Sequence, residues 1–314
     1  MSLIYEQIKK IAQSKASVLI QGESGTGKEL IARAIHVHSP RCENPFIRVN
    51  CAALAETLLE SELFGHERGA YTGAISKHTG RFELANEGTL LLDEISEISP
   101  NIQAKLLRVL EEEEIERVGG EKTIKIDVRI VATTNRNLMN EIQKGTFRED
   151  LFYRLNVVPI YLPPLRERRG DIPLLVDYYL RKYSLENNAV VKSIDKEAVD
   201  YLCQYNWPGN IRELKNIIQR AVVMGSQEVL QLEQFNCLFT HQDVERPGNT
   251  STAGKAIEDV ERDLIYSTLE KTCGNKTKAA ELLKITARTL RNKLHKYNEG
   301  PKPVFETETI SCAE

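Results

Sequence analysis

The chain has 314 residues, of which 41% are hydrophobic and 28% are charged, and its formal net charge is −3. This length allows one sizeable core with one or two small modules, and the composition is that of an ordinary globular protein. The sequence has no run of about eighteen apolar residues and no basic start leading into an apolar stretch, so we expect neither a membrane span nor a signal peptide. These features predict a cytoplasmic protein.

Six cysteines stand at positions 42, 51, 203, 237, 273 and 312. They are widely scattered, with no Cys-x-x-Cys pair and no nearby histidine cluster, which argues against a zinc site and against a disulfide framework. We expect reduced thiols, most of them packed in the interior.

A glycine-rich turn lies between a strand-like run at 17–21 and a helix-like run that starts at Leu30. Glycines let successive backbone N–H groups turn inward, the following helix presents its positive end, and a lysine here can reach the β and γ phosphates. The turn consists of Gly22, Glu23, Ser24, Gly25, Thr26, Gly27, Lys28 and Glu29. It predicts binding of a nucleoside triphosphate. Glu29 departs from the usual pattern, because a Ser or Thr hydroxyl normally holds Mg²⁺ there.

From residue 1 to 165, short β-rich runs alternate with amphipathic, helix-like stretches. The strands are expected at 17–21, 46–50, 89–93, 127–133 and 157–161. This alternation predicts an α/β fold with a parallel sheet covered by helices.

Two carboxylates, Asp93 and Glu94, follow the apolar run at 89–92. A buried strand would bring Asp93 to its carboxyl end beside the glycine-rich turn, where an anion can hold Mg²⁺ directly or through water. Glu94 would then orient or deprotonate the attacking water. An ordinary strand with an acidic end is the plain alternative, which the upstream phosphate-binding motif disfavours.

Polar residues 133–135 leave the next strand at the same edge of the sheet, where they could sense the γ-phosphate or position water. Asn135 could equally cap the following helix. Further on, Arg148 and Arg154 stand beside acidic residues and could be solvated or ion-paired. In a ring they could instead reach a neighbour's nucleotide and stabilise charge on the transferred phosphoryl group.

Helical periodicity takes over in the second part of the chain, so we expect a small helical subdomain at 166–240. A stretch with linker composition follows at 241–255. Three more helices, at 256–272, 276–283 and 287–297, make up a C-terminal domain at 256–298, and 299–314 is expected to be a disordered tail.

The C-terminal domain is basic, with eight Lys or Arg against one acid between Lys271 and Tyr297, a local net charge of +7. Its last two helices, joined by a short turn, have helix-turn-helix spacing, and polar and basic residues occupy the start of the second helix, where a recognition helix meets base edges. A basic, solvated helical hairpin is the alternative. The candidate DNA contacts are Lys276, Lys278, Thr286, Arg288, Thr289, Arg291, Asn292 and Lys293.

The glycine-rich turn, the Asp93–Glu94 pair and the polar and arginine residues that follow them resemble the central AAA+ domain of NtrC-type bacterial enhancer-binding proteins. Together with the motifs at 62–67, 69–74 and 207–214, this resemblance extends over about residues 5–240. The basic end is similar to the Fis-type domain of the same family. The resemblance implies an AAA+ P-loop ATPase with a helical lid, a cytoplasmic regulator of the two-component type that activates transcription. The family usually carries an N-terminal regulatory domain, and no receiver domain is expected within this chain.

The resemblance also implies partners and residue roles. Asn50 would hold Glu94 inactive until the γ-phosphate is sensed, Asn135 would belong to the catalytic set, Arg148 and Arg154 would act on a neighbour's nucleotide, and Arg212 would report nucleotide state to the lid. The sigma-54 factor of RNA polymerase would contact a hexapeptide formed by Gly69, Ala70, Tyr71, Thr72, Gly73 and Ala74. Tyr71 stands where the family has phenylalanine, and a second loop at 116–120 would support the first.

The family further implies a hexamer or heptamer ring formed by the ATPase domain, a dimer contact through helix 256–272, and binding to double-stranded enhancer DNA. Two other classes of protein combine an ATPase-like module with a basic helical domain. A DNA-remodelling motor or replication initiator would have no use for the 69–74 loop, and a regulator with a non-hydrolysing core would not need the Asp93–Glu94 pair.

Overall fold

The computed structural model of the chain describes residues 2–71, 76–225 and 227–235, and parts of the C-terminal region at 261–262, 265–266, 268, 276–283 and 285–298. The chain divides into two compact units, Met1–Thr240 and His241–Glu314. The predicted linker at 241–255, the tail at 299–314 and the hexapeptide residues 72–74 lie outside the described residues.

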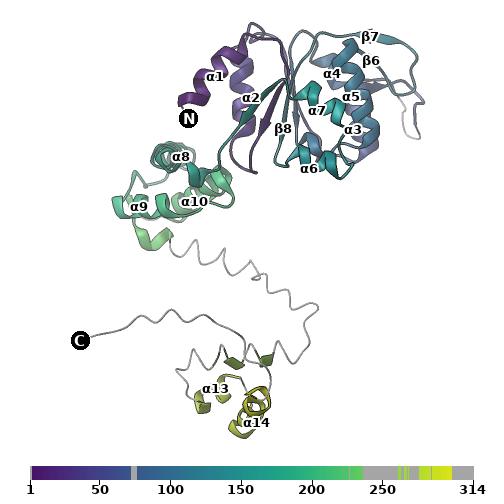
Figure 1. Cartoon of the computed structure of the whole chain (residues 1–314). Helices are drawn as coiled ribbons and strands as arrows, with labels where there is room; N and C mark the ends of the chain where they lie inside the picture. The colour runs from purple at the N-terminus through teal and green to yellow at the C-terminus, as the bar shows by residue number, and fades with distance from the viewer. Residues whose placement is uncertain are drawn as a thin grey trace. The chain divides into compact units, whose positions relative to one another are not determined.

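The first unit is built on a five-stranded parallel sheet of order β2-β5-β8-β1-β9 (Figure 1). The strand register sets Leu19 beside Ala132 and Asn50 beside Asp93. The strands are β1 (Val18–Gln21), β2 (Phe46–Asn50), β5 (Thr89–Asp93), β8 (Arg129–Thr134) and β9 (Val158–Tyr161). These five strands confirm the predicted α/β architecture, with bounds within two residues of expectation.

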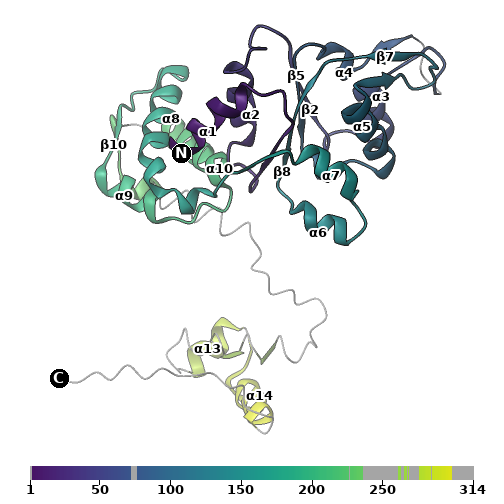
Figure 2. The ribbon, with the colours of Figure 1, turned by 45° about the horizontal axis from the view of Figure 1, so that its top comes forward.

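Alternation along the buried strands divides the core between the two faces of the sheet. Leu91 packs with Ile8, Ile31 and Ile35 of α1 and α2, whereas its neighbours Leu90 and Leu92 pack with the helices on the opposite face. Figures 1 and 2 show these two helical layers with the sheet between them. The helices are α1 (Ser2–Ala12), α2 (Lys28–Val37), α3 (Glu56–Phe64), α4 (Arg81–Leu84), α5 (Pro100–Glu112), α6 (Leu138–Gln143) and α7 (Glu149–Leu155), with a short 3₁₀ turn η1 (Ile95–Glu97).

A buried arginine attaches the first helix to the central strand. Arg129, only 2% exposed, donates hydrogen bonds of 2.7 Å to the carbonyls of Ile11 and Ala12 at the end of α1. Those carbonyls have no partner within the helix, and a cation at a helix C-terminus also interacts favourably with the helix dipole. Burial lowers the pKa of Arg129 to about 10, so the side chain still carries its charge at neutral pH.

The helical subdomain, which contains α8, α9 and α10, follows the last strand (Figure 2). It has its own core around Trp207. Trp207 is fully buried and donates its indole N–H to the Leu202 carbonyl at 2.8 Å. The elements are η2 (Leu165–Glu167), η3 (Arg169–Asp171), α8 (Ile172–Glu186), α9 (Lys196–Gln204), α10 (Asn210–Met224) and the short pair β10 (Ser193–Ile194) and β11 (Val229–Leu230). The helices α8, α9 and α10 confirm that a small helical subdomain follows the sheet.

Two small antiparallel ribbons that the sequence did not predict project from the first unit. One pairs β3 (Gly65–His66) with β4 (His78–Thr79) and brings together the two ends of the 69–74 segment. The other pairs β6 (Glu114–Glu116) with β7 (Thr123–Lys125).

The second unit contains α13 (Lys276–Leu282) and α14 (Ala287–Asn298) around a small core. Ala279, Ala280 and Leu290 are buried there together with Ile265, and small alanines allow the two helices to approach closely. Two of the three predicted C-terminal helices are thus confirmed. The first, at 256–272, falls mostly outside the described residues. Among the helices in the described part of the chain, none combines the length and apolar character that a bilayer crossing requires.

Candidate active site

The glycine-rich turn joins β1 to α2 at the carboxyl edge of the sheet. Gly25 and Gly27 have φ of 79° and 99°, a region that side chains other than glycine rarely adopt. A Cβ at Gly25 would lie 2.4 Å from the carbonyl oxygen of Gly209 in the lid. Glycine is therefore required here both for the turn and for the close approach of a second backbone.

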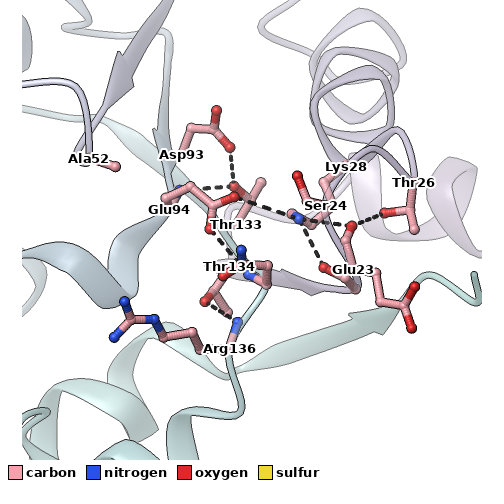
Figure 3. A network of polar contacts seen from close by, with 12 residues as sticks. Glu23, Ser24, Thr26, Lys28, Ala52, Asp93, Glu94, Thr133, Thr134 and Arg136 are labelled. Carbon is pink, nitrogen blue, oxygen red and sulfur yellow. Dashed lines mark hydrogen bonds and ion pairs between the residues drawn. The ribbon is translucent and has the colours of Figure 1, made fainter. Parts of the chain in front are cut away.

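Lys28 begins α2 and folds back over the turn. Its Nζ donates to the carbonyls of Gly22 and Glu23 at 2.9 and 3.2 Å, and it lies 3.9 Å from Glu94 Oε1 (Figure 3). The side chain is 6% exposed. Burial lowers the pKa of Lys28, and the nearby carboxylates of Glu94 and Asp93 oppose that shift. The ammonium group is thus held at the phosphate side of the turn.

The acid pair ends β5, and Thr133 of the neighbouring strand ties its two members together. Thr133 Oγ1 donates to Asp93 Oδ1 at 2.5 Å and accepts from the Glu94 backbone N–H at 3.3 Å (Figure 3). Glu94 has φ of 56°, an unfavourable conformation for a residue with a side chain. Its Oε2 accepts from the backbone N–H of Asn135 at 3.2 Å. Backbone strain at this carboxylate is typical of functional sites.

The second oxygen of Asp93 is bound by an arginine that the sequence did not single out. Arg48 donates to Asp93 Oδ2 at 3.1 Å and to Glu29 Oε1 at 2.5 Å. Arg48 lies two residues before Asn50 on β2, so both side chains share the face of the sheet that α2 covers. That alternation was the sequence signal that could have identified Arg48.

Asn50 ends β2 and Asn135 follows β8, the two strands that flank β5, after which Glu94 stands. Asn50 lines the same cleft as Glu94, and its Oδ1 accepts from the Ala52 backbone N–H at 2.9 Å. The predicted restraint of Glu94 by Asn50 stays a prediction. The helix cap that Asn135 could have supplied is provided instead by Asn137, whose side chain accepts from two backbone N–H groups at the start of α6.

The lid binds the phosphate loop through several hydrogen bonds. Asn210 has φ of 53°, and its amide donates to Glu23 Oε2 and to the Ser24 carbonyl, both at 3.1 Å. The Ile211 backbone N–H donates to the Gly25 carbonyl at 2.9 Å, and Arg212 donates to Ser24 Oγ at 2.7 Å. Arg212 therefore lies beside the loop, as its predicted role requires.

Two arginines of the segment between β9 and α8 add to this contact. Arg166 donates to both carboxylate oxygens of Glu23 at 2.6 and 2.9 Å, and Arg168 donates to the Thr26 carbonyl at 2.7 Å. Both arginines follow a Pro-Pro pair in a basic run. Such a run is typical of a solvated surface segment, so the sequence did not indicate these contacts. The lid and the phosphate loop are consequently linked by side chains as well as by backbone.

The Glu23 ion pair makes this contact sensitive to acid. Hydrogen bonds from Arg166 and Asn210 lower the pKa of Glu23 from 4.5 to about 2. A carboxylate whose pKa is lower in the folded state stabilises the fold above its unfolded pKa and loses that effect as pH falls through the folded value. We therefore expect the melting temperatures of wild type and Glu23→Gln to differ at pH 7 and to converge between about pH 4.5 and 2.

Thermal unfolding followed by circular dichroism across this pH range measures the difference. Glu6→Gln, at an exposed glutamate of α1, removes the same charge away from the lid and serves as the control. A gap between wild type and Glu23→Gln that stays constant down to pH 2 would contradict the assignment.

These elements enclose one cleft of about 480 Å³ between the sheet and the lid. Its lining includes Ser24, Gly25, Gly27, Lys28, Glu29, Arg48, Asn50, Asp93, Glu94 and Arg212. The buried thiol of Cys51 lies next to this region, and burial raises its pKa to about 12, so it is not a nucleophile at neutral pH. The structure therefore brings together most of the predicted nucleotide-site residues.

Arg148 and Arg154 stand apart from the cleft at the two ends of α7. Arg148 donates to both oxygens of Asp150 at 2.6 and 3.0 Å, and Arg154 pairs with Glu111 at 3.0 Å. Both side chains are about half exposed. They are ion-paired, as the plain interpretation of the sequence allows, and they do not line the cleft of their own chain.

The base of the 69–74 segment packs against the tip of the β6–β7 ribbon. Arg117 donates to Glu83 and Glu67, and the Glu67 backbone N–H donates to the Val118 carbonyl at 3.1 Å. A Cβ at Gly119 would lie 2.8 Å from that of Ala70. The second loop thus packs against the first at Ala70, and its predicted supporting role stays a prediction. Tyr71 is exposed and contacts the His66 ring.

Most candidate DNA contacts are exposed on the second unit. Thr286 caps α14 by accepting from the Thr289 backbone N–H at 3.1 Å. Lys293 forms an ion pair with Glu261 rather than standing alone. The exposed candidates are Lys276, Lys278, Thr286, Arg288, Arg291 and Asn292, and Thr289 is half-buried. Their roles stay predictions.

Family models match along almost the whole chain. The sigma-54 interaction domain matches residues 1–161, the AAA+ ATPase lid domain matches 166–252, and the bacterial regulatory protein domain of the Fis family matches 256–297. The chain belongs to the sigma-54-dependent AAA+ family of transcriptional regulators. Members of this family are ATPases, and the fold, the cleft and the C-terminal helices of this chain agree with that membership.

Relatives in this family align with nearly the entire chain. Regulatory protein AtoC of Escherichia coli K12 is 54% identical over 308 residues, covering 96% of this chain and 67% of AtoC. Transcriptional regulatory protein ZraR of Salmonella typhimurium is 50% identical over 296 residues, covering 94% and 66%. The crystal structure of NtrX from Brucella abortus in complex with ATP matches with a TM-score of 0.72 and 34% identity, covering 94% and 67%. The chain thus spans about two thirds of the length of these relatives.

Proposed function

We propose that this regulator hydrolyses ATP between adjacent copies of itself and uses the cycle to remodel the closed complex of sigma-54 RNA polymerase while it is bound to upstream DNA. The observation that carries the proposal is the division of the catalytic set. Lys28, Asp93 and Glu94 share one cleft, whereas Arg148 and Arg154 lie outside it, with half-exposed side chains at the two ends of α7. A complete site then requires the arginines of a second copy.

Within one copy, Lys28 binds the β and γ phosphates and Arg212 reads the nucleotide from the lid. Glu94 orients or deprotonates the attacking water, since its carboxylate lies at the phosphate side of the cleft within 3.9 Å of Lys28. ATP itself is proposed by analogy with the ATP and ADP complexes of the NtrX relative. Asn50 and Asn135 complete the set around Glu94.

The residues beside the phosphate loop fit Mg²⁺. Carboxylate oxygens are the ligands this ion prefers, and Asp93 is 14% exposed at the cleft with Glu29 and Glu94 nearby. We assign the metal to Asp93. When bound, the metal would neutralise charge on the phosphates during transfer.

The 69–74 hexapeptide would contact the sigma factor. Its base is held by the Arg117 contacts with Glu67 and Glu83, beside the β3–β4 ribbon. The second unit would bind double-stranded DNA as a dimer, with lysines on phosphates and Arg288, Arg291 and Asn292 near base edges. The ring would contain six or seven copies and act in the cytoplasm.

The division of the site between copies predicts complementation between two inactive variants. Lys28→Ala lacks its own phosphate contact but can donate Arg154, whereas Arg154→Ala has an intact cleft. Mixing them in equal amounts should restore about a quarter of the wild-type rate, since half the clefts are competent and half of those face an intact arginine. Phosphate release measures the rate, which should also rise steeply with protein concentration in the wild type.

The double variant Lys28→Ala with Arg154→Ala provides the control, because mixing it with Arg154→Ala supplies no intact arginine and should restore nothing. Activity of Arg154→Ala alone at the wild-type rate would overturn the role of this arginine in a neighbour's site.

A further inference from the structure

Arg48 joins two carboxylates that belong to different elements. The guanidinium lies between Glu29 at the start of α2 and Asp93 at the end of β5, at 2.5 and 3.1 Å. The strand register pairs Asn50 with Asp93 and Arg48 with Leu91, so Arg48 sits on the α2 side of the sheet two residues away from the acid. The planar, forked guanidinium can bind both carboxylates at once.

This arrangement gives each oxygen of Asp93 a hydrogen-bond donor. Oδ1 accepts from Thr133 at 2.5 Å and Oδ2 accepts from Arg48. Thr133 is a neutral donor fixed on the neighbouring strand, whereas Arg48 is a cation on a long side chain that is 42% exposed. A second cation that binds Asp93 must therefore compete with Arg48.

Glu29 gives the guanidinium a place to remain after it leaves Asp93. Glu29 stands where a phosphate loop ordinarily has a hydroxyl that holds the metal, and it lines the same cleft. Arg48 can lose the longer contact to Asp93 and keep the shorter one to Glu29 with a small change of rotamer.

We propose that Arg48 is a positioning residue that occupies Asp93 until a divalent cation enters with the nucleotide, and that its competition sets the affinity of the site for that cation. The inference rests on the proposed role of Asp93 in metal binding. It assigns a function to the departure at position 29, because Glu29 retains the displaced arginine within the cleft.

Binding of Mn²⁺ in the presence of ADP, counted by the electron paramagnetic resonance signal of the free ion, tests the proposal without relying on turnover. Arg48→Ala should bind Mn²⁺ about threefold more tightly than wild type, on the scale of a partly exposed ion pair. Arg48→Lys keeps the charge and should bind more like wild type. Unchanged or weaker Mn²⁺ binding by Arg48→Ala would overturn the proposal.

Arg81→Ala is the matched control. Arg81 is 40% exposed and pairs with Glu62 at 2.7 Å, so its removal changes the net charge equally at a distance from the cleft. Its Mn²⁺ affinity should equal that of wild type, and a threefold gain there would attribute the effect to net charge and overturn the inference. If wild type with ADP binds no Mn²⁺, the proposed metal site itself fails, which separates the two ideas.

Discussion

Replacing Lys28 with alanine should lower the rate of ATP hydrolysis by at least about 100-fold, the typical effect of losing one preorganised group that stabilises transferred charge. The ammonium group is buried at the phosphate side of the loop, where few other charges can substitute for it. Phosphate release at saturating ATP measures the rate, and thermal unfolding confirms that the variant is folded.

Lys215→Ala is the control for this prediction. Lys215 lines the same cleft from α10 but is exposed, so water can replace its charge. We expect its rate to stay within a few-fold of wild type. Equal losses in both variants would mean that the cleft responds to net charge and would contradict a specific role for Lys28.

Thr72→Ala should separate hydrolysis from transcription. None of the described hexapeptide residues, 69–71, lines the cleft, so ATP turnover should stay near the wild-type rate. Open-complex formation on a sigma-54 promoter should fall to background if the threonine contacts the sigma factor. Permanganate footprinting of the melted promoter measures that step.

An exposed threonine of α3 offers the comparison, since Thr57→Ala makes the same chemical change away from the hexapeptide. It should retain both activities. Loss of hydrolysis together with open-complex formation in Thr72→Ala would instead make the loop a structural part of the ATPase.

The elements that the sequence predicted well are those whose pattern is local. The five sheet strands are apolar runs ended by polar residues, and Asp93 and Glu94 follow directly from the end of one of them. The phosphate loop combines a strand, glycines and a helix within a few residues. Local signals of this kind survive in almost any tertiary context.

The features that were missed depend on contacts between distant segments. Arg166 binds Glu23 across 143 positions of the chain, and nothing in its basic neighbourhood distinguishes it from a solvated arginine. The ribbons β3–β4 and β6–β7 have two or three residues per strand, too few for a period to be recognised. Alternation along β2 places Arg48 on the same face as Asn50, but its contact with Asp93 could be predicted only by knowing that β2 and β5 are neighbours.

The hydrogen bonds from Asn210 and Ile211 to the phosphate loop have a consequence for motion. The lid cannot swing as a free hinge over the nucleotide, because moving α10 would break the hydrogen bonds that Asn210 and Ile211 donate to the backbone carbonyls of Ser24 and Gly25. Turning α10 would instead drag the loop along with it. Departure of the cleaved phosphate would then alter the tilt of the entire helical subdomain. In an assembly, that tilt would change the position of one copy against the next.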